Sequence, residues 1–289
     1  MWLILGGNGQ LGKCLADALQ TQDIAFVSVG RERCDITSPD AVNRVISDLH
    51  PAVVVNAAAW TAVDAAESDP VGAMAVNSTG ASNIARACAS VGATLVHVST
   101  DYVFSGQTDT PIPENAPRDP VSAYGKSKAE GEAQVVGHHP NNSYIIRTAW
   151  LYSRYGKNFA KTMAARALSG SHVRVVNDQI GQPTCASDLA EHIINLVSSG
   201  APVGIYHGTN SGQASWYEFA AEIYSLLGQE RNLVTPVPTS EYPTPAVRPT
   251  WSVLGHERTS EARLREMADW KSALSVEMPH IIAALSEEQ

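Results

Sequence analysis

Short apolar runs alternate with amphipathic segments through the first half of the chain. The run at residues 2–5 is followed by a helical pattern in which Leu11, Leu15 and Leu19 recur at i, i+4 and i+8. Further strand-like runs stand at residues 25–29, 53–55, 95–98 and 144–146. Strands that alternate with helices form parallel sheets with crossover helices. The pattern predicts an α/β fold with a doubly wound parallel sheet.

Several helices can be placed from their starting residues. Ser38 and Pro39 are typical of an N-cap and first turn, and they open an apolar helical pattern that ends near Leu49. A long helix is predicted from the apolar positions between residues 76 and 91. Residues 215–218 read Ser-Trp-Tyr-Glu, which is a capping box in front of another helix.

A glycine-rich turn follows the first predicted strand. Residues 6–12 read Gly-Gly-Asn-Gly-Gln-Leu-Gly, which satisfies both the G-x-x-G-x-x-G and the G-x-G-x-x-G spacing. Glycines allow close backbone approach, and the N-terminus of the next helix offers free N–H groups and a positive dipole end to phosphates. The turn predicts a dinucleotide site in an NAD(P)-binding Rossmann fold, formed by Gly6, Asn8, Gly9, Gln10, Leu11 and Gly12.

The end of the second predicted strand bears on which dinucleotide binds. The strand ends in Gly30 and Arg31, with no acid at its end. A carboxylate there would bind the ribose of NAD, whereas an arginine can pair with the 2′-phosphate of NADP. NADP(H) is therefore favoured, with NAD(H) open as an alternative and a solvated surface charge as the other interpretation of Arg31. Asp35 either approaches the adenine edge or starts the turn at residues 35–39.

Composition excludes several classes of function. The 289 residues are 44% hydrophobic, enough for one large domain and a smaller lobe. A net charge of −9 without a basic cluster argues against a nucleic-acid partner, and no apolar run is long enough to span a membrane. The four cysteines have neither metal-ligand spacing nor the density of a secreted scaffold. We expect a cytoplasmic protein with free thiols and no metal site, since the apolar strand at residue 2 is no signal peptide.

The second half of the chain has a different texture. Five prolines crowd residues 236–249, and the regular alternation of strands and helices stops near residue 150. We expect an NADP(H)-binding Rossmann domain over residues 1–149 and a mainly substrate-binding lobe over residues 150–289. Later segments are free to return to the sheet.

Candidate catalytic groups lie between residues 99 and 128. Ser99 and Thr100 follow a predicted strand at its carboxyl end, where ligands of open α/β sheets bind. Tyr124 and Lys128 have the i,i+4 spacing that places both on one helix face. Hydride transfer to a carbonyl leaves an alkoxide that needs a proton, and a phenol beside an ammonium can supply it. Lowering a phenol pKa from near 10 to 7 takes about 4 kcal/mol.

These residue types lead to specific roles. Tyr124 is predicted to be the general acid. Lys128 is predicted to lower the pKa of Tyr124 and to hold the nicotinamide ribose. Thr100 is expected to polarise the carbonyl, in preference to Ser99.

Together these segments resemble the dTDP-4-dehydrorhamnose reductase family of the extended short-chain dehydrogenase/reductase superfamily. The resemblance covers nearly the whole chain and is carried by residues 6–12, 56–64, 99–104, 124–132 and 147–152, with later motifs at Asn158-Phe159, Asp178-Gln179, Gly181, Pro183-Thr184 and Arg248-Pro249. It implies NADPH-dependent reduction of the 4-keto group of dTDP-4-dehydro-6-deoxy-L-mannose to dTDP-L-rhamnose, the last step in making that nucleotide sugar.

The resemblance also implies roles for residues of the substrate half. Trp150 would pack against the hexose, and Arg248 would pair with the nucleotide diphosphate. The further expected contacts are Tyr102 and Asn158 for the substrate, beside Thr100, and Ala57, Ala58 and Ala59 for the cofactor. Structural alternatives stay open: a core position for Trp150, an ion pair for Arg248 and close strand packing for the alanines. For Arg147, Asn158 and Asp178 the alternatives are a buried ion pair, a turn and a loop cap.

Two positions depart from the family pattern. Some relatives carry a glutamate near the position of Cys14 that is linked to a divalent ion between subunits, and a thiol does not replace a carboxylate toward a hard cation. This leaves a role for Mg²⁺, and the choice between monomer and homodimer, undecided. Family members commonly have two arginines before the proline, where this chain has Val247 and Arg248.

Rival functions come from the same superfamily. A reductase of another nucleotide-linked 4-ketosugar and a non-catalytic NADP-binding regulatory subunit are the alternatives, and intact Thr100, Tyr124 and Lys128 argue against the second. A dehydratase needs an Asp-Glu pair after the threonine, whereas Asp101-Tyr102 follows here. An epimerase would hold NAD tightly, against which Arg31 argues.

Overall fold

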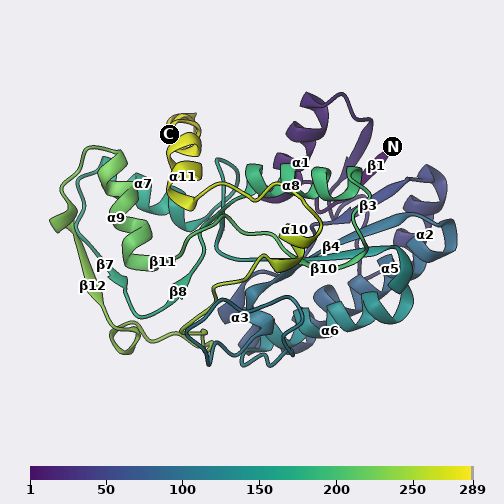
Figure 1. Cartoon of the computed structure of the whole chain (residues 1–289), viewed down its shortest axis with the longest axis horizontal. Coiled ribbons are helices and arrows are strands. Elements are labelled where there is room, and N and C mark those ends of the chain that lie inside the picture. Colours follow the sequence, from purple (N-terminus) through teal and green to yellow (C-terminus); the bar gives the residue numbers. More distant parts are fainter. Residues whose placement is uncertain (288–289) are drawn as a thin grey trace.

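A six-stranded parallel sheet forms the centre of the computed structural model, which describes residues 1–287 (Figure 1). The strand order is β10–β5–β4–β3–β1–β2. The strands are β1 (Trp2–Leu5), β2 (Phe26–Val29), β3 (Val53–Asn56), β4 (Thr94–Thr100), β5 (Ser143–Thr148) and β10 (Gly204–His207). The predicted doubly wound α/β fold is confirmed, since every pairing in this sheet is parallel.

The two faces of the sheet carry different helices because successive strand residues point to opposite sides. Trp2 and Ile4 of β1 pack with α1 (Gln10–Thr21) and α8 (Ala186–Ser198). Leu3 and Leu5 belong to the core of the other face, which is covered by α2 (Pro39–Leu49) and α5 (Gly80–Val91), with α6 (Ala123–His138) beside α5 (Figure 1). Because helices cover both faces of the sheet, its central strands are buried on both sides, which explains why their sequences are continuously apolar.

Local capping agrees with the predicted helix starts. The Ser38 hydroxyl accepts from the Ala41 N–H at 3.3 Å at the start of α2. The capping box at Ser215 and Glu218 opens α9 (Trp216–Leu226), with both reciprocal hydrogen bonds present. The long helix predicted between residues 76 and 91 is confirmed by α5 (Gly80–Val91). Its first residues differ, because a π-helical turn at Ala75–Thr79 joins α5 to α4 (Pro70–Met74).

A smaller lobe follows the carboxyl end of β5. Its helices α7 (Phe159–Leu168), α9 and α11 (Trp270–Glu287) share a core that includes Tyr152, Phe219 and Trp270. Its short strand pairs are β7 (Val173–Val176) with β12 (Val234–Val237), β6 (Leu151–Tyr152) with β9 (Thr184–Cys185), and β8 (Ile180–Gly181) with β11 (Ala214–Ser215). Elsewhere in the described chain, two short helices complete the structure, α3 (Val63–Ser68) and α10 (Glu257–Glu261). Short 3₁₀ turns lie at Asp101–Val103, Pro140–Asn142, Arg231–Leu233 and Thr239–Glu241.

The chain crosses between sheet and lobe more than once. Although they come after residue 150, β10 is a strand of the sheet and α8 packs on it. Later segments therefore return to the sheet, and the division into residues 1–149 and 150–289 stays a prediction. Among the described residues, no helix combines the length and apolarity needed to cross a membrane. Within residues 1–287, no cluster of three or more His, Cys, Asp or Glu side chains is arranged to hold a metal ion.

The strand order reverses between β1 and β3, with β2 on one side and β4 on the other. Ligands of open α/β sheets bind at such a switch point, outside the carboxyl ends of the strands. The glycine turn after β1 and the alanines after β3 meet at this edge, and the lobe stands beside it.

Candidate active site

The glycine turn forms a close-fitting cradle beside β3. Gly6 has φ +82°, and a Cβ on it would lie 2.6 Å from the backbone nitrogen of Ala58. A Cβ on Gly12 would lie 2.4 Å from the Gly6 carbonyl oxygen, so the third glycine lets α1 pack against the turn. The α1 N-terminus therefore faces the switch point with its first N–H groups free for an anion. The residues present fit a dinucleotide pyrophosphate.

Two clefts meet at this turn. A cleft of about 530 Å³ is lined by Gly9, Gln10 and Leu11 on the sheet side and reaches toward the lobe. A second cleft of about 340 Å³ lies toward β2 and is lined by Gly6, Asn8, Gly9, Arg31, Asp35, Ala57, Ala58 and Ala59, among others. Every predicted cofactor residue except Gly12 thus lines one or both clefts.

Arg31 and Asp35 form an exposed pair at the second cleft. Arg31 Nε lies 3.2 Å from Asp35 Oδ2, and the arginine side chain is 81% exposed. Asp35 also accepts from the N–H and the hydroxyl of Thr37, at 3.0 and 2.7 Å. The Thr37 hydrogen bonds, and then Arg31, hold the pKa of Asp35 below its usual value. Asp35 therefore starts the turn while it also lines the cleft.

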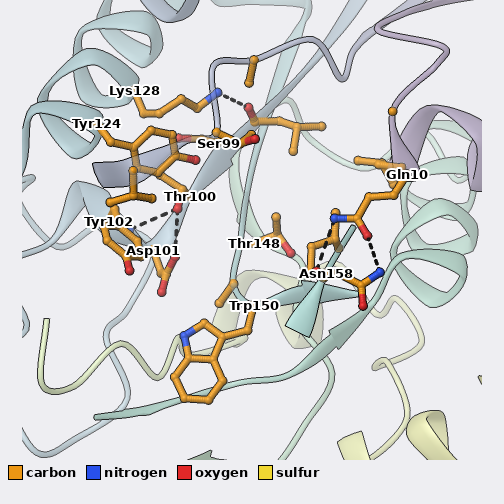
Figure 2. A pocket seen from close by; sticks show the side chains of 18 of the residues that line it. Gln10, Ser99, Thr100, Asp101, Tyr102, Tyr124, Lys128, Thr148, Trp150 and Asn158 are labelled. Atoms are coloured by element: carbon orange, nitrogen blue, oxygen red, sulfur yellow. Dashed lines mark hydrogen bonds between the residues drawn. The ribbon is translucent and has the colours of Figure 1, made fainter. Parts of the chain in front are cut away.

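Tyr124 and Lys128 lie on α6, and both are buried in the larger cleft (Figure 2). Ser122 caps the helix by accepting from the Gly125 N–H at 3.1 Å. Gly125 is needed because a Cβ there would lie 2.2 Å from the Tyr102 carbonyl oxygen. The i,i+4 spacing brings both side chains toward the end of β4. Lys128 Nζ donates to the Val98 carbonyl oxygen at 2.6 Å.

Burial dominates the electrostatics of this pair. It raises the pKa of Tyr124; a hydrogen bond with Thr100 acts against the shift, and the charge of Asp101 adds to it. Burial lowers the pKa of Lys128 to about 8, although Glu132 opposes the shift. In this structure the Lys128 ammonium is directed at the Val98 carbonyl oxygen, and the shift of the Tyr124 pKa comes from burial, Thr100 and Asp101, so an effect of Lys128 on that pKa stays a prediction.

Thr100 ends β4 between Asp101 and Tyr124. Its hydroxyl donates to Asp101 Oδ1 at 2.8 Å and accepts from the Tyr102 N–H at 3.2 Å. Desolvation raises the pKa of Asp101 to about 6, while hydrogen bonds from Ser252 and Thr100 lower it. Tyr102 packs edge-on against Tyr124, with ring centroids 5.6 Å apart. Thr100 and Tyr102 thus lie together in the larger cleft.

Ser99 points away from this arrangement and into a buried ionic cluster. Its hydroxyl donates to Glu132 Oε1 at 2.6 Å. Arg147 binds both oxygens of Glu132, at 2.9 and 2.8 Å, and is 1% exposed. Arg147 does not line any of the three described clefts. It is therefore the buried ion pair that the sequence left as one of two alternatives.

The lobe side of the larger cleft is aromatic. Trp150 has φ +44° and stacks on Trp216, with ring centroids 3.6 Å apart and an interplanar angle of 9°. The stack covers one face of Trp150, and Gly181 also lies against the ring, since a Cβ there would come within 2.6 Å of Trp150 Cε2. A sugar can therefore meet only the part of the indole that lines the cleft. Asn158 caps α7 by accepting from the Lys161 N–H at 3.0 Å, and its amide donates to the Ser153 carbonyl oxygen at 2.7 Å. Asn158 is thus a turn-forming residue that also lines the cleft.

Arg248 lies between the larger cleft and a third one of about 310 Å³. Its guanidinium binds Asp64 at 3.0 and 2.8 Å and donates to the Thr244 hydroxyl at 2.6 Å. The Asp64 carboxylate raises the pKa of Arg248, and the pKa of Asp64 is lowered in return. The third cleft is also lined by Phe159, Met163, Val175, Trp216 and Tyr242. Asp178 does not line these clefts and accepts from Thr239, which makes it a loop cap.

Some contacts have no clear signal in the sequence. Trp216 lines two of the clefts. In the sequence it is only the second residue of a capping box, a pattern that predicts a helix start and not a binding site. Asp64 lies in one of the segments that carry the family resemblance, but the sequence alone indicates no function for it. Thr148 ends β5 with a buried hydroxyl that has no hydrogen-bond partner among the described residues, and it faces the larger cleft (Figure 2).

Cys14 is buried in α1, 3.7 Å from the Ser187 hydroxyl. Burial raises its pKa to about 11, so the thiol stays protonated near neutral pH. A neutral thiol beside a hydroxyl offers no hard ligand at this position, which agrees with the departure noted in the sequence.

Known proteins resemble this chain over nearly its whole length. The family described as "RmlD substrate binding domain" matches residues 1–281. A dTDP-4-dehydrorhamnose reductase from Streptomyces griseus is 43% identical over 96% of this chain and 93% of its own length. A dTDP-4-keto-6-deoxy-D-glucose reductase from Streptomyces niveus is 40% identical over 96% of both chains.

A solved structure shares both fold and sequence with this chain. It is a dTDP-4-dehydrorhamnose reductase from Bacillus anthracis in complex with NADP, which superposes with a TM-score of 0.93 at 37% identity, over 96% of this chain and 98% of the other. Identity at this level over the full length is more than a shared Rossmann architecture. The chain belongs to the dTDP-4-dehydrorhamnose reductase family.

Proposed function

We propose that the chain is an NADPH-dependent reductase that converts the 4-keto group of dTDP-4-dehydro-6-deoxy-L-mannose to the alcohol of dTDP-L-rhamnose. The observation that carries the proposal is the meeting of Thr100, Tyr124 and the glycine turn in one cleft. Membership of the family supplies the substrate class, because its named members act on dTDP-linked ketosugars.

NADPH is the proposed coenzyme. The Bacillus anthracis relative binds NADP, and Arg31 of this chain lines the cleft toward β2, where a 2′-phosphate would lie. The glycine turn would hold the pyrophosphate, and Ala57, Ala58 and Ala59 would let the coenzyme approach the backbone. Lys128 has two ammonium hydrogens left after its bond to Val98, and we assign them to the hydroxyls of the nicotinamide ribose.

Proton transfer is assigned to the groups at the end of β4. When bound, NADPH supplies hydride to the carbonyl carbon. Tyr124 gives its phenolic proton to the sugar oxygen; its raised pKa keeps it protonated near neutral pH, the state that a reduction needs. The Thr100 hydroxyl donates to the same oxygen, for which it must release Asp101 Oδ1. Tyr102 packs against Tyr124 and limits the directions from which the sugar oxygen can approach.

The remaining substrate groups are assigned to the lobe. The part of the Trp150 ring that lines the cleft would pack on the hexose, Asn158 would border it, and Arg248 would bind the diphosphate beside its pairing with Asp64. We infer a cytoplasmic enzyme, since its four cysteines are free and buried.

A specific observation favours a second candidate sugar. The Streptomyces niveus relative is a dTDP-4-keto-6-deoxy-D-glucose reductase and is nearly as similar to this chain as the Streptomyces griseus protein. The two substrates differ in sugar configuration, which the lobe must distinguish.

The test compares both sugars directly. Purified protein is given NADPH with enzymatically prepared dTDP-4-dehydro-L-rhamnose or with dTDP-4-keto-6-deoxy-D-glucose, and loss of NADPH absorbance is followed. We expect a much higher kcat/KM for the L-sugar. Faster turnover of the D-sugar would assign the second function, and turnover of neither sugar despite NADPH binding would contradict both.

A further inference from the structure

One hydroxyl of the larger cleft has no partner among the described residues. Thr148 is the last residue of β5, it is 8% exposed, and its Oγ1 makes no hydrogen bond within residues 1–287. It lies between the Thr100 and Tyr124 side chains and Trp150 (Figure 2). A buried hydroxyl without a partner is destabilising, and valine would fill the same space in a strand without that cost. The hydroxyl therefore indicates a ligand that approaches from the cleft.

Strand pairing fixes Thr148 beside Thr100. The two residues are partners in the parallel register of β4 and β5. Neighbouring strands lie about 4.8 Å apart, and paired residues point to the same face of the sheet. The preceding pair, Ser99 and Arg147, points to the other face, where both side chains bind Glu132. This buried cluster holds the two strand ends together, so the spacing of the two threonines is rigid.

The position of Thr100 identifies the part of the substrate that comes near Thr148. In the proposed reaction, Thr100 and Tyr124 bind the 4-keto oxygen of the sugar. Of the two carbons beside this ketone only C3 carries a hydroxyl, because C5 carries the ring oxygen and the methyl group. The C3 hydroxyl is therefore the sugar hydroxyl nearest to the keto oxygen, and it lies within reach of a group one strand away from Thr100. Each of the two hydroxyls can donate and accept.

We propose that Thr148 binds the C3 hydroxyl of the ketosugar and reads its configuration. The inference rests on the proposed function, because it concerns the substrate of that reaction. The two candidate sugars have opposite configurations at C3 and at C5. A hydroxyl held at a fixed distance from Thr100 can meet the C3 hydroxyl of one sugar and misses that of the other. Thr148 thus adds a residue of the sheet to the discrimination that the lobe makes.

The test removes the hydroxyl from the protein and from the sugar in turn. Thr148→Val deletes the hydroxyl and keeps the shape of the side chain, whereas Thr148→Ser keeps the hydroxyl. Thr259→Val is the matched control, because Thr259 on α10 also has a buried hydroxyl without a partner among the described residues and lines none of the three clefts. kcat/KM with NADPH is measured for dTDP-4-dehydro-L-rhamnose and for its analogue without the C3 hydroxyl. The Kd for NADPH is measured by coenzyme fluorescence.

We expect kcat/KM for the L-sugar to fall about tenfold in Thr148→Val and to stay within about threefold of the wild type in Thr148→Ser and Thr259→Val. With the analogue, Thr148→Val and the wild type should be equally active, because the partner of the threonine hydroxyl is already missing. The Kd for NADPH should stay the same in every variant.

A similar loss with both sugars in Thr148→Val, or no loss with the L-sugar, would overturn the role of Thr148 and leave the proposed function standing. Weaker NADPH binding in Thr148→Val would assign the hydroxyl to the coenzyme and overturn its contact with the sugar. No turnover of the L-sugar by the wild type would overturn the proposed function and this inference with it.

Discussion

The Lys128 ammonium lies 2.6 Å from the Val98 carbonyl oxygen, to which it donates a hydrogen bond. Val98 precedes Thr100 by two residues on β4, and Lys128 follows Tyr124 by one helical turn on α6. This hydrogen bond, together with the one from Ser99 to Glu132, therefore connects the helix that carries the proposed acid to the strand that carries its threonine neighbour. Rigid elements, and not loops, set the geometry of the three groups.

The lowered pKa of Lys128 predicts how activity depends on pH. The ammonium is charged below its pKa of about 8 and loses its proton, and with it a donor to the ribose, as the pH rises above that value. We expect kcat/KM for the ketosugar, at fixed NADPH, to fall tenfold per pH unit above about pH 8. Lys126→Met, an exposed lysine on the same helix, should leave the profile unchanged. A flat wild-type profile up to about pH 9.5 would contradict the assignment.

Removing the phenolic hydroxyl tests the proton donor. Tyr124→Phe keeps the buried ring and its edge contact with Tyr102, so the fold and the coenzyme cleft should survive. We expect turnover to fall by about 10³-fold or more and the Kd for NADPH to stay within a few-fold of the wild type. Stopped-flow and fluorescence titration would measure the two quantities. Residual turnover near the wild-type level would assign the proton to another group.

The indole stack predicts a substrate-binding effect at Trp216. Trp216→Ala removes the ring that holds Trp150 in place, and an aromatic pair is worth about 0.5–1.5 kcal/mol beyond its burial. We expect KM for the ketosugar to rise about tenfold with an unchanged Kd for NADPH. Trp216→Phe should recover most of the loss. If the sugar KM did not change in Trp216→Ala, the Trp150 ring would not be the binding surface of the sugar.

Arg248 and Asp64 give a prediction for the nucleotide end of the substrate. Arg248→Ala removes the proposed diphosphate contact, and calorimetric titration with dTDP should show affinity falling at least tenfold. Asp64→Asn frees the guanidinium from its partner, so dTDP should bind as tightly as in the wild type or more tightly. Weaker dTDP binding in Asp64→Asn than in Arg248→Ala would mean that the aspartate, and not the arginine, organises the site.

The buried cluster below Ser99 predicts a large stability effect. Glu132→Gln leaves Arg147 charged and without its carboxylate in a fully buried place, which costs about 3–5 kcal/mol. Glu241→Gln is the matched control, because Glu241 pairs with Arg174 on the surface, where such a pair is worth about 1 kcal/mol or less. Urea unfolding measures both. Similar losses in the two variants would contradict the account of the cluster.

Much of the fold could be predicted from the sequence because its signals are local. The apolar runs at residues 2–5 and 53–55 form strands that are buried on both faces. Ser38 and Ser215 start helices through hydrogen bonds to residues only three positions further along the chain. The glycine turn is likewise defined by its own backbone. The Tyr124 and Lys128 pair follows from the period of one helix.

The parts that escaped prediction depend on contacts between distant segments or on folded-back side chains. Trp216 and Trp150 are 66 residues apart in sequence, and they meet because the first residue of α9 lies beside the segment that follows β5. Glu32 reaches the end of β2 because the backbone turns after Gly30, which no periodicity reveals. The direction of the Lys128 ammonium depends on the carbonyl that β4 presents to it.

Transfer of isotope from coenzyme to sugar tests the central claim most directly. The protein is incubated with dTDP-4-dehydro-L-rhamnose and NADPH that carries deuterium at the transferred position of the nicotinamide, and the product is analysed by mass spectrometry and NMR. The account predicts dTDP-L-rhamnose with one deuterium at C4, and no labelled product with Tyr124→Phe. Unlabelled product, or label at another carbon, would contradict it.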